Sequence, residues 1–187
     1  MVDKKAEIFK AGRELFLLKG FKDVNVSDIT REAGVGVGTF YNYYQSKGEL
    51  FFDVYFRENE AAKKSIVRSL DLNDDPITLV TKFLSLSTGA IKKNRILQEW
   101  YNKDIFGDLE KRYNDKYGCF LFDFYMDLLK KWKRENKIRS DIDDELLVAL
   151  MNSVIYLDTH KEEIGIQYFP EVTKLLVKFI MKGLTDR

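Results

Sequence analysis

Residues 34–44 read GVGVGTFYNYY, in which glycines at every second position are followed by a dense aromatic run. Two kinds of chemistry use such a pattern. Closely spaced glycines can wrap backbone N–H groups around a phosphate, as nucleotide-binding loops do. Glycines can also form a tight turn ahead of a short helix whose hydroxyl groups and free amides contact DNA phosphates.

The nucleotide-binding interpretation fails on spacing and on context. A G-x-G-x-x-G pattern would need glycine where Thr39 stands, and no Lys-Ser/Thr pair follows at Walker spacing. Such loops also follow a strand, whereas the segment upstream has helical spacing. The sequence therefore favours the DNA interpretation.

The residues around this stretch predict a helix-turn-helix. Short helices are expected at about 26–33 and 37–44, joined by a turn at 34–36, because that turn often uses glycine. Small residues let a backbone approach the duplex closely, and Thr and Tyr hydroxyls can bond phosphate oxygens. The start of the second helix, which would meet the major groove, presents Val37, Gly38, Thr39, Tyr41, Asn42 and Tyr43.

Flanking helices must hold this pair in place. A first helix has Ile8, Ala11, Leu15 and Leu18 on one face and ends at Gly20, where positive φ is expected. Asn25 can cap the second helix, with Asp28 returning a bond. Ser46 and Glu49 form a capping box in which the Glu49 side chain should accept from the amide of Ser46. That box opens a long helix from about 47 to 70.

Helical spacing continues to the end of the chain, and no strand is evident. Pro76 can start a helix after an Asp/Asn-rich break, and further helices are expected at about 76–92, 95–104, 107–135, 143–160 and 169–184. The prediction is an all-α fold with an N-terminal three-helix DNA-binding domain and a larger C-terminal helical domain for ligand binding and dimerisation. We expect the first domain at 1–48 and the second at 49–187.

The composition leaves DNA binding open. The formal net charge of the 187 residues is +1, so any DNA contact must come from local arrangement. Cys119 is the single cysteine, which excludes an intramolecular disulfide and suits a reducing cytoplasm. The charged N-terminus does not resemble a signal peptide, and no stretch reaches the length of a membrane span. A soluble cytoplasmic protein is expected.

Enzymatic and metal chemistry have little to build on. The chain has one cysteine and one histidine, His160, and no serine in a nucleophile setting. His160 falls at a helix end, where a cation suits the helix dipole, and the acidic run 141–145 is typical of helix-start capping. We expect no catalytic residue, metal or cofactor.

Residues 8–52 resemble the DNA-binding domain of the TetR family of bacterial transcriptional regulators. The order AGVxxGTFYxYYxSK at 33–47, with ITREAG at 29–34, carries the resemblance. Family members usually have Ser or Thr where Gly36 stands, capping the recognition helix. The matching residues are Ile8, Ala11, Leu15, Phe16, Gly20, Phe21, Val26, Ile29, Ala33, Gly34, Val35, Gly38, Thr39, Phe40, Tyr41, Tyr44, Lys47, Leu50 and Phe51.

The resemblance implies roles for individual side chains. Thr39, Tyr41 and Lys47 would hold phosphates, and Val37, Asn42 and Tyr43 would face base edges. Core packing is an equal alternative for Tyr43. Ser27 and Arg31 on the preceding helix are candidate groove or backbone contacts. Gly38 would serve close approach. Phe40 and Tyr44 are expected to pack in the core beneath the helix.

Specific DNA binding by so small a domain generally needs two copies on a near-palindromic double-stranded operator. Segments 143–160 and 169–184 are apolar on more than one side, which suits a helix with two neighbours. A buried core helix would show the same pattern. The family resemblance favours a homodimer in which these last two helices of each subunit form a four-helix interface.

Aromatic residues are abundant between 83 and 132 and could line an apolar pocket with a few polar tips. The resemblance implies a small-molecule effector there, and the lining candidates are Trp100, Tyr101, Phe124, Tyr125 and Tyr156. The prediction is a homodimeric repressor that a small apolar or amphipathic effector releases from DNA. Alternatives are an activator, a TetR-like regulator that takes no small ligand, and a helical protein-interaction module without DNA binding.

Overall fold

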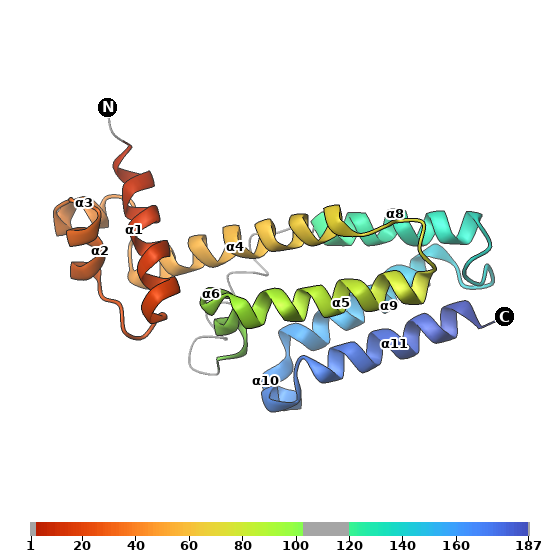
Figure 1. The fold of residues 1–187 in the computed structure, drawn as a ribbon. Coiled ribbons are helices and arrows are strands. Elements are labelled where there is room, and N and C mark those ends of the chain that lie inside the picture. The colour runs from red at the N-terminus through yellow and green to blue at the C-terminus, as the bar shows by residue number, and fades with distance from the viewer. Residues whose placement is uncertain (1–2, 103–119, 187) are drawn as a thin grey trace. The chain divides into compact units, whose positions relative to one another are not determined.

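The computed structural model describes residues 3–102 and 120–186, and every regular element within these ranges is helical (Figure 1), which confirms the all-α prediction. The helices are α1 (Lys4–Lys19), α2 (Val26–Glu32), α3 (Val37–Tyr41), α4 (Lys47–Ser69), α5 (Pro76–Lys93), α6 (Arg95–Gln98), η1 (Glu99–Tyr101), α8 (Phe120–Arg134), α9 (Asp144–Thr159), α10 (Lys161–Ile164), η2 (Ile166–Tyr168) and α11 (Glu171–Thr185). The part of the predicted 107–135 helix before Phe120 lies outside the described residues, as does Cys119. No helix in the described ranges is long and apolar enough to cross a bilayer.

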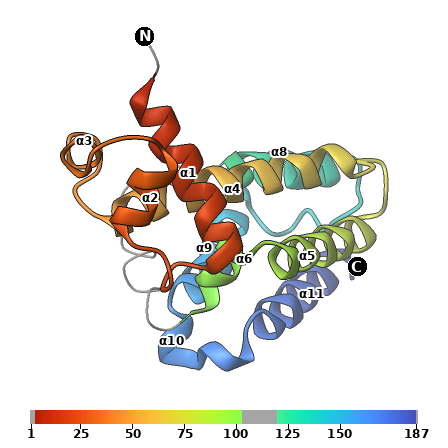
Figure 2. The same cartoon turned by 60° about the vertical axis from the view of Figure 1, so that its left-hand side comes forward.

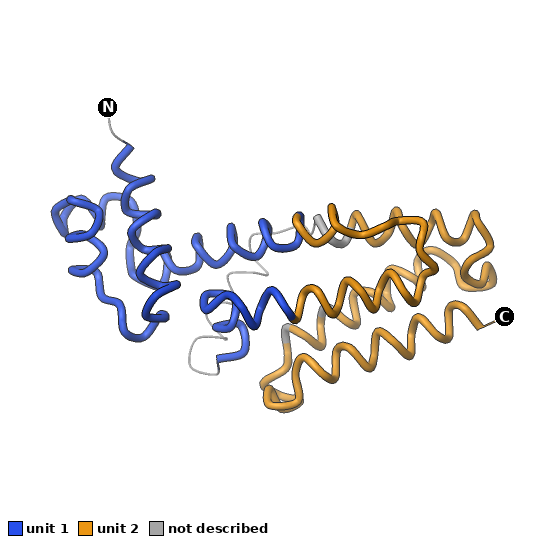
Figure 3. The backbone as a smooth tube through the Cα atoms, in the orientation of Figure 1, with its two compact units in different colours: residues 1–64, 89–109 blue, residues 65–88, 110–187 orange. Residues whose placement is uncertain are grey.

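The chain forms two compact units (Figure 3). Unit 1 comprises 1–64 and 89–109, and unit 2 comprises 65–88 and 110–187. The divisions fall inside α4 and α5, so each of these helices contributes to both units. The DNA-binding domain proposed for residues 1–48 lies wholly within unit 1.

Unit 1 contains α1 to α3 packed with the first part of α4 (Figure 2). A Cβ added at Gly12 of α1 would lie 2.7 Å from Leu50 Cδ2, so glycine allows α1 to approach α4 closely. Leu18 was expected on the buried face of α1 but is 71% exposed, because the buried face follows Ile8, Gly12 and Phe16 and leaves Leu18 at its edge. The side chains that are fully buried in this unit include Ile8, Phe16, Ile29, Phe40 and Leu50.

The predicted caps are formed, with one change of partner. Asn25 and Asp28 make a complete capping box on α2, and Gly20 has the expected positive φ of 83°. At α4 the Ser46 hydroxyl accepts from the Glu49 amide at 3.1 Å. The Glu49 carboxylate, however, accepts from the amide of Gln45 at 2.6 Å, not from that of Ser46. The Glu49 carboxylate therefore caps the backbone amide one residue nearer to α3 than predicted.

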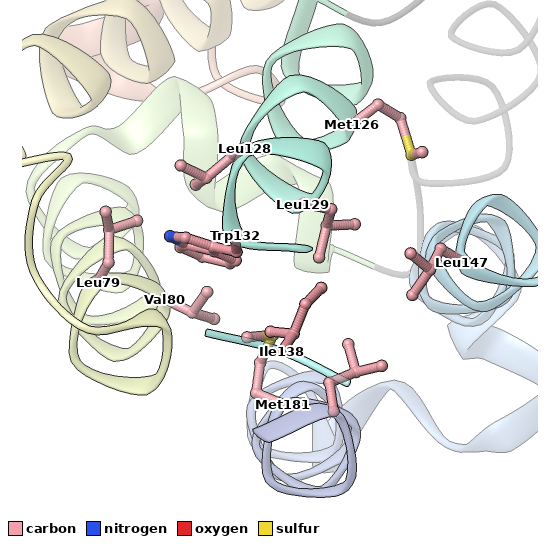
Figure 4. Close-up of a cluster of buried hydrophobic side chains, with 10 residues drawn as sticks. Leu79, Val80, Met126, Leu128, Leu129, Trp132, Ile138, Leu147 and Met181 are labelled. Carbon is pink, nitrogen blue, oxygen red and sulfur yellow. The ribbon is translucent and has the colours of Figure 1, made fainter. Parts of the chain in front are cut away.

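Unit 2 has a core shared by α5, α8, α9 and α11 (Figure 4), with Trp132 of α8 only 1% exposed. The helices α9 and α11 pack on one another and are joined by the short α10 and η2, which the sequence had not indicated. Asp143 caps α9 by accepting from the Leu146 amide at 2.7 Å, as expected for the acidic run. The buried cluster consists of Leu79, Val80, Met126, Leu128, Leu129, Trp132, Ile138, Leu147, Met181 and Leu184.

Candidate nucleic-acid interface

The turn between α2 and α3 is built from backbone hydrogen bonds. Gly34 has φ of 65°, and the amide of Val35 donates to the Thr30 carbonyl at 3.0 Å. Gly36 is the N-cap of α3 and has no side chain to cap it. α3 ends at Tyr41, three residues earlier than predicted, and Tyr43 and Tyr44 continue as a turn that bonds to the Phe40 carbonyl. The helix-turn-helix is thus formed around a recognition helix of five residues.

Residues 37–44, the recognition segment, have one buried side and one exposed side. Phe40 and Tyr44 are buried, at 0% and 3% exposure, as predicted for residues that pack beneath the helix. Val37, Tyr41 and Tyr43 are 47%, 54% and 40% exposed. Gly38 and Asn42 are also exposed, whereas Thr39 is partly covered. The proposed base-facing and phosphate-holding residues of α3 therefore share the side that its own domain leaves open.

Gly38 has no steric role within the described chain. No described atom lies within 4 Å of the position that a Cβ would occupy there, and its φ is not positive. A side chain at this position would therefore project into open space. Glycine at the start of an exposed helix is consistent with close approach by a surface outside the domain, such as a DNA groove.

The two candidate residues on α2 are exposed. The Arg31 guanidinium donates to Asp28 Oδ1 at 2.7 Å, while its side chain stays 75% exposed. Arg31 can therefore keep this bond and still offer other N–H groups to a phosphate or a base edge. Ser27 has an exposed side chain on the same helix.

Lys47 differs from the other candidate residues because its ammonium group bonds to carbonyl groups within unit 1. Its Nζ donates to the carbonyl oxygens of Phe21 and Val24, each at 2.7 Å. It also lies 4.1 Å from the centre of the Phe21 ring. Burial lowers the pKa of Lys47 from its usual value, and the charge of Asp23 opposes that shift. Two of its three donors thus hold the loop between α1 and α2.

The residues that form this geometry are similar to those of known proteins. The family model described as bacterial regulatory proteins of the tetR family matches residues 8–54. The HTH-type transcriptional regulator SAB2452 of Staphylococcus aureus is 24% identical over 183 residues, which cover 90% of this chain and 89% of that protein. The uncharacterized HTH-type regulator YfiR of Bacillus subtilis is 26% identical over 120 residues, covering 59% of this chain and 58% of YfiR.

Residues 8–54 thus match the DNA-binding domain of the TetR family. Both of these relatives are named as HTH-type transcriptional regulators. A structure of RolR in complex with resorcinol has a TM-score of 0.69 at 17% identity, covering 97% of this chain and 87% of RolR. Thermus thermophilus FadR in complex with lauroyl-CoA has a TM-score of 0.60 at 21% identity, covering 98% and 96%. These two likenesses show a shared fold.

Within unit 1, the segment at α6 and η1 binds the loop that follows α1. Arg95 donates to the Leu18 carbonyl at 2.6 Å, and the Phe21 amide donates to Glu99 Oε1 at 3.2 Å. A Cβ at Gly20 would lie 3.4 Å from Arg95 Nε, so glycine also leaves room for this arginine. The α1–α2 loop is therefore held by charged side chains from α6 and η1 as well as by Lys47.

A second link joins the same segment to α1 and α4. Glu58 of α4 accepts from Arg13 Nε at 2.5 Å and from Asn94 Nδ2 at 2.6 Å. Asn94 in turn caps α6 through the amides of Ile96 and Leu97. Sequence reasoning missed Glu58, Asn94, Arg95 and Glu99. The capping type of Asn94 was the one available signal, because the other contacts join residues far apart in the chain.

The five effector candidates are divided between the two units. Trp100 and Tyr101 belong to unit 1, where Trp100 is 7% exposed and stacks on Tyr55 with ring centres 5.8 Å apart. Phe124 and Tyr125 belong to unit 2 and are partly buried. Tyr156 is 59% exposed on α9. The other aromatic residues between 103 and 119 lie outside the described residues.

Two further observations on the described ranges concern small-molecule and metal binding. A hollow of about 440 Å³ is lined by Lys130, Lys133, Arg134 and Asp144, a charged surface that does not suit an apolar effector. No group of three or more metal-ligating side chains occurs within the described ranges. His160 follows α9 as its C-cap, with Nδ1 2.9 Å from the Tyr156 carbonyl oxygen.

Proposed function

We propose that the chain is a homodimeric repressor that binds a near-palindromic operator through α3 and is released by a small apolar or amphipathic effector. The observation that carries the DNA contact is the division of residues 37–44 into a buried side, Phe40 and Tyr44, and an exposed side that includes Val37 and Tyr41. The exposed valine and tyrosine of this five-residue helix are available to an external partner.

In the proposed complex, Thr39, Tyr41 and the remaining N–H of Lys47 hold phosphates. Val37, Asn42 and Tyr43 face base edges, with Ser27 and Arg31 of α2 contacting the groove wall or the backbone. Because base-edge contacts carry the sequence information, we expect the operator preference to depend on the second group. A regulator of this kind acts where the bacterial chromosome is, in the cytoplasm.

The dimer proposal rests on the exposed side of α9. The twelve residues from Leu146 to Leu157 include no Asp, Glu, Lys or Arg. Leu146 and Tyr156 are 49% and 59% exposed, and the small residues Ala149 and Ser153 are exposed between them. A solvent-facing helix surface without charge along this length is typical of a surface that another helix covers.

α11 supplies a matching strip in the same unit. Leu175 and Phe179 are 53% and 65% exposed and lie one turn apart, with Lys178 and Lys182 exposed beside them. An apolar centre with a charged rim is the usual anatomy of a protein interface. α9 and α11 pack on one another, so their strips can present one continuous surface to a second copy. Two helices from each subunit would then form a four-helix interface.

The effector proposal is supported by the ligands of proteins with the same fold, resorcinol in RolR and lauroyl-CoA in FadR. Both ligands combine apolar surface with polar groups. Such a ligand would suit lining residues like Trp100, Tyr101, Phe124 and Tyr125. Tyr156 lies on the proposed dimer surface, so we give it a smaller part in any pocket. An effector that displaces Asn94, Arg95 or Glu99 would alter the bonds that hold the α1–α2 loop.

The experiment that tests this function is selection of bound duplexes from a random DNA pool by the purified full chain. A near-palindromic winner, bound by two chains, is the expected result. Recovery of no preferred sequence would contradict operator binding, and a winner without two-fold symmetry would contradict the dimer. Candidate aromatic and acyl compounds can then be tested for release of that duplex, and release by none of them would favour a regulator without a small ligand.

A further inference from the structure

The recognition helix is too short to fix its own orientation. α3 has five residues, and a single turn of helix is marginal without tertiary contacts. What holds it on the buried side is the aromatic pair beneath it, where Phe40 and Tyr44 have ring centres 5.9 Å apart. Tyr41, on the exposed side, packs its ring edgewise against Phe40 at 5.4 Å. The direction in which Tyr41 points therefore depends on how this buried pair is anchored.

Tyr44 is anchored by its hydroxyl group. Its side-chain oxygen donates to Asp53 Oδ2 of α4 at 3.1 Å. Burial, followed by the charge of Asp53, raises the pKa of Tyr44 well above its ordinary value, so the phenol remains protonated and can donate. The end of the recognition segment is thereby tied to the long helix α4.

Asp53 connects this bond to α1. Its Oδ1 lies 3.4 Å from Arg57 Nε, and its Oδ2 lies 3.5 Å from Arg57 Nη2. The Arg57 guanidinium in turn lies 4.4 Å from the centre of the Phe9 ring of α1. One carboxylate thus receives both Tyr44 and Arg57, and the contacts run from the recognition segment through α4 to α1, all within unit 1.

We propose that Asp53 and Tyr44 are positioning residues that set the orientation of the recognition helix for sequence reading, without touching DNA themselves. This rests on the proposed reading of DNA by α3. Base-edge hydrogen bonds are directional and short, whereas phosphate contacts tolerate small shifts of a helix. Loosening the Tyr44–Asp53 link therefore lowers affinity for the operator more than affinity for unrelated DNA.

The test uses Asp53→Asn, Tyr44→Phe and the double variant in the full chain. Affinity is measured over a salt series for two duplexes, the one that the parent protein selects from a random pool and a scrambled version of it. Each single variant is expected to lose about five- to tenfold in affinity for the selected duplex, which is within the worth of a typical intramolecular hydrogen bond. Affinity for the scrambled duplex should stay within about twofold and the salt slope should not change.

Two expected results distinguish the positioning role from a simple charge effect and from two independent contributions to affinity. Removing a carboxylate from a DNA-binding head should by charge alone strengthen binding to every duplex, so a selective loss in Asp53→Asn has the opposite sign. The double variant should lose about as much as either single variant, because both break the same link. Asp127→Asn on α8, an exposed carboxylate of unit 2, is the matched charge control and should change neither affinity.

Equal losses on both duplexes, or unchanged affinity for the selected one, would overturn the positioning role. A thermal unfolding curve for each variant checks that the DNA-binding domain remains folded. If Asp53→Asn does not fold, the affinities of Tyr44→Phe alone decide the test. Tyr41→Ala in the same assay reports on the proposed function. If Tyr41→Ala weakens binding and the other variants do not, the positioning role alone fails. If none of them weakens binding, DNA reading by α3 fails as well.

Discussion

The ammonium of Lys47 lies 2.7 Å from the carbonyl oxygen of Phe21, while the amide of Phe21 donates to Glu99. One residue of the α1–α2 loop is therefore held on its carbonyl side by the start of α4 and on its amide side by η1. Lys47 lies three residues after Tyr44, the end of the recognition segment. A shift at η1 consequently has a short covalent and hydrogen-bonded route to the residues proposed to touch DNA.

Lys47→Met should reveal two roles at once. Loss of the donor leaves the Phe21 and Val24 carbonyls without this ammonium, so the melting temperature should fall by several degrees. Loss of one phosphate contact should also lower the slope of log affinity against log salt by about one. An unchanged melting temperature would contradict the loop-holding role, and an unchanged slope would contradict the phosphate contact.

Tyr41→Ala should weaken binding to selected and scrambled duplexes alike, by about tenfold, because a phosphate contact carries no sequence information. Fluorescence anisotropy with labelled duplexes measures both affinities. Tyr168→Ala is the matched control, since Tyr168 is 59% exposed in unit 2 and Tyr41 is 54% exposed. A comparable loss in the control would show that the effect does not come from α3.

Phe179→Asp should convert the proposed dimer to a monomer at micromolar concentration, because a charge would enter an apolar interface without a partner. Sedimentation should report a mass near 22.0 kDa for the variant and twice that mass for the parent. Leu86→Asp places the same charge on α5 at a position that is 44% exposed and outside the α9–α11 surface. That variant should have the same sedimentation mass as the parent. A parent protein with the mass of a monomer would refute the dimer.

Glu99→Ala should free the amide of Phe21. Hydrogen exchange at that amide should accelerate about tenfold, because its acceptor at 3.2 Å is lost. Ala6 of α1, whose amide bonds to Asp3, serves as the internal reference. Unchanged exchange at Phe21 would mean that Glu99 does not restrain the loop in solution.

Sequence alone predicted those features of the site that depend on local geometry. The capping box of Asn25 and Asp28 spans three residues, and positive φ at Gly20 follows from its position after a helix. Burial of Phe40 and Tyr44 was expected from the family pattern, and both are buried. Each of these features is determined by neighbours within one or two helical turns.

The contacts that sequence could not predict join distant residues. Glu99 meets Phe21 across 78 positions, and Glu58 meets Arg13 across 45. Glutamate and arginine at such positions are indistinguishable in sequence from solvated surface charges. The early end of α3 was also missed, because the aromatic residues that follow Tyr41 fit a helix as well as the turn they form.

The uncharged side of α9 has a consequence for partner choice. Between Leu146 and Leu157 no like-charge repulsion is available to reject a foreign subunit. Along α9, discrimination against mixed assemblies would fall to shape, above all at the exposed small residues Ala149 and Ser153, while any contribution of charge would come from Lys178 and Lys182 beside the α11 strip. A cell that carries several regulators with this architecture would then depend on steric fit along α9 to keep them apart.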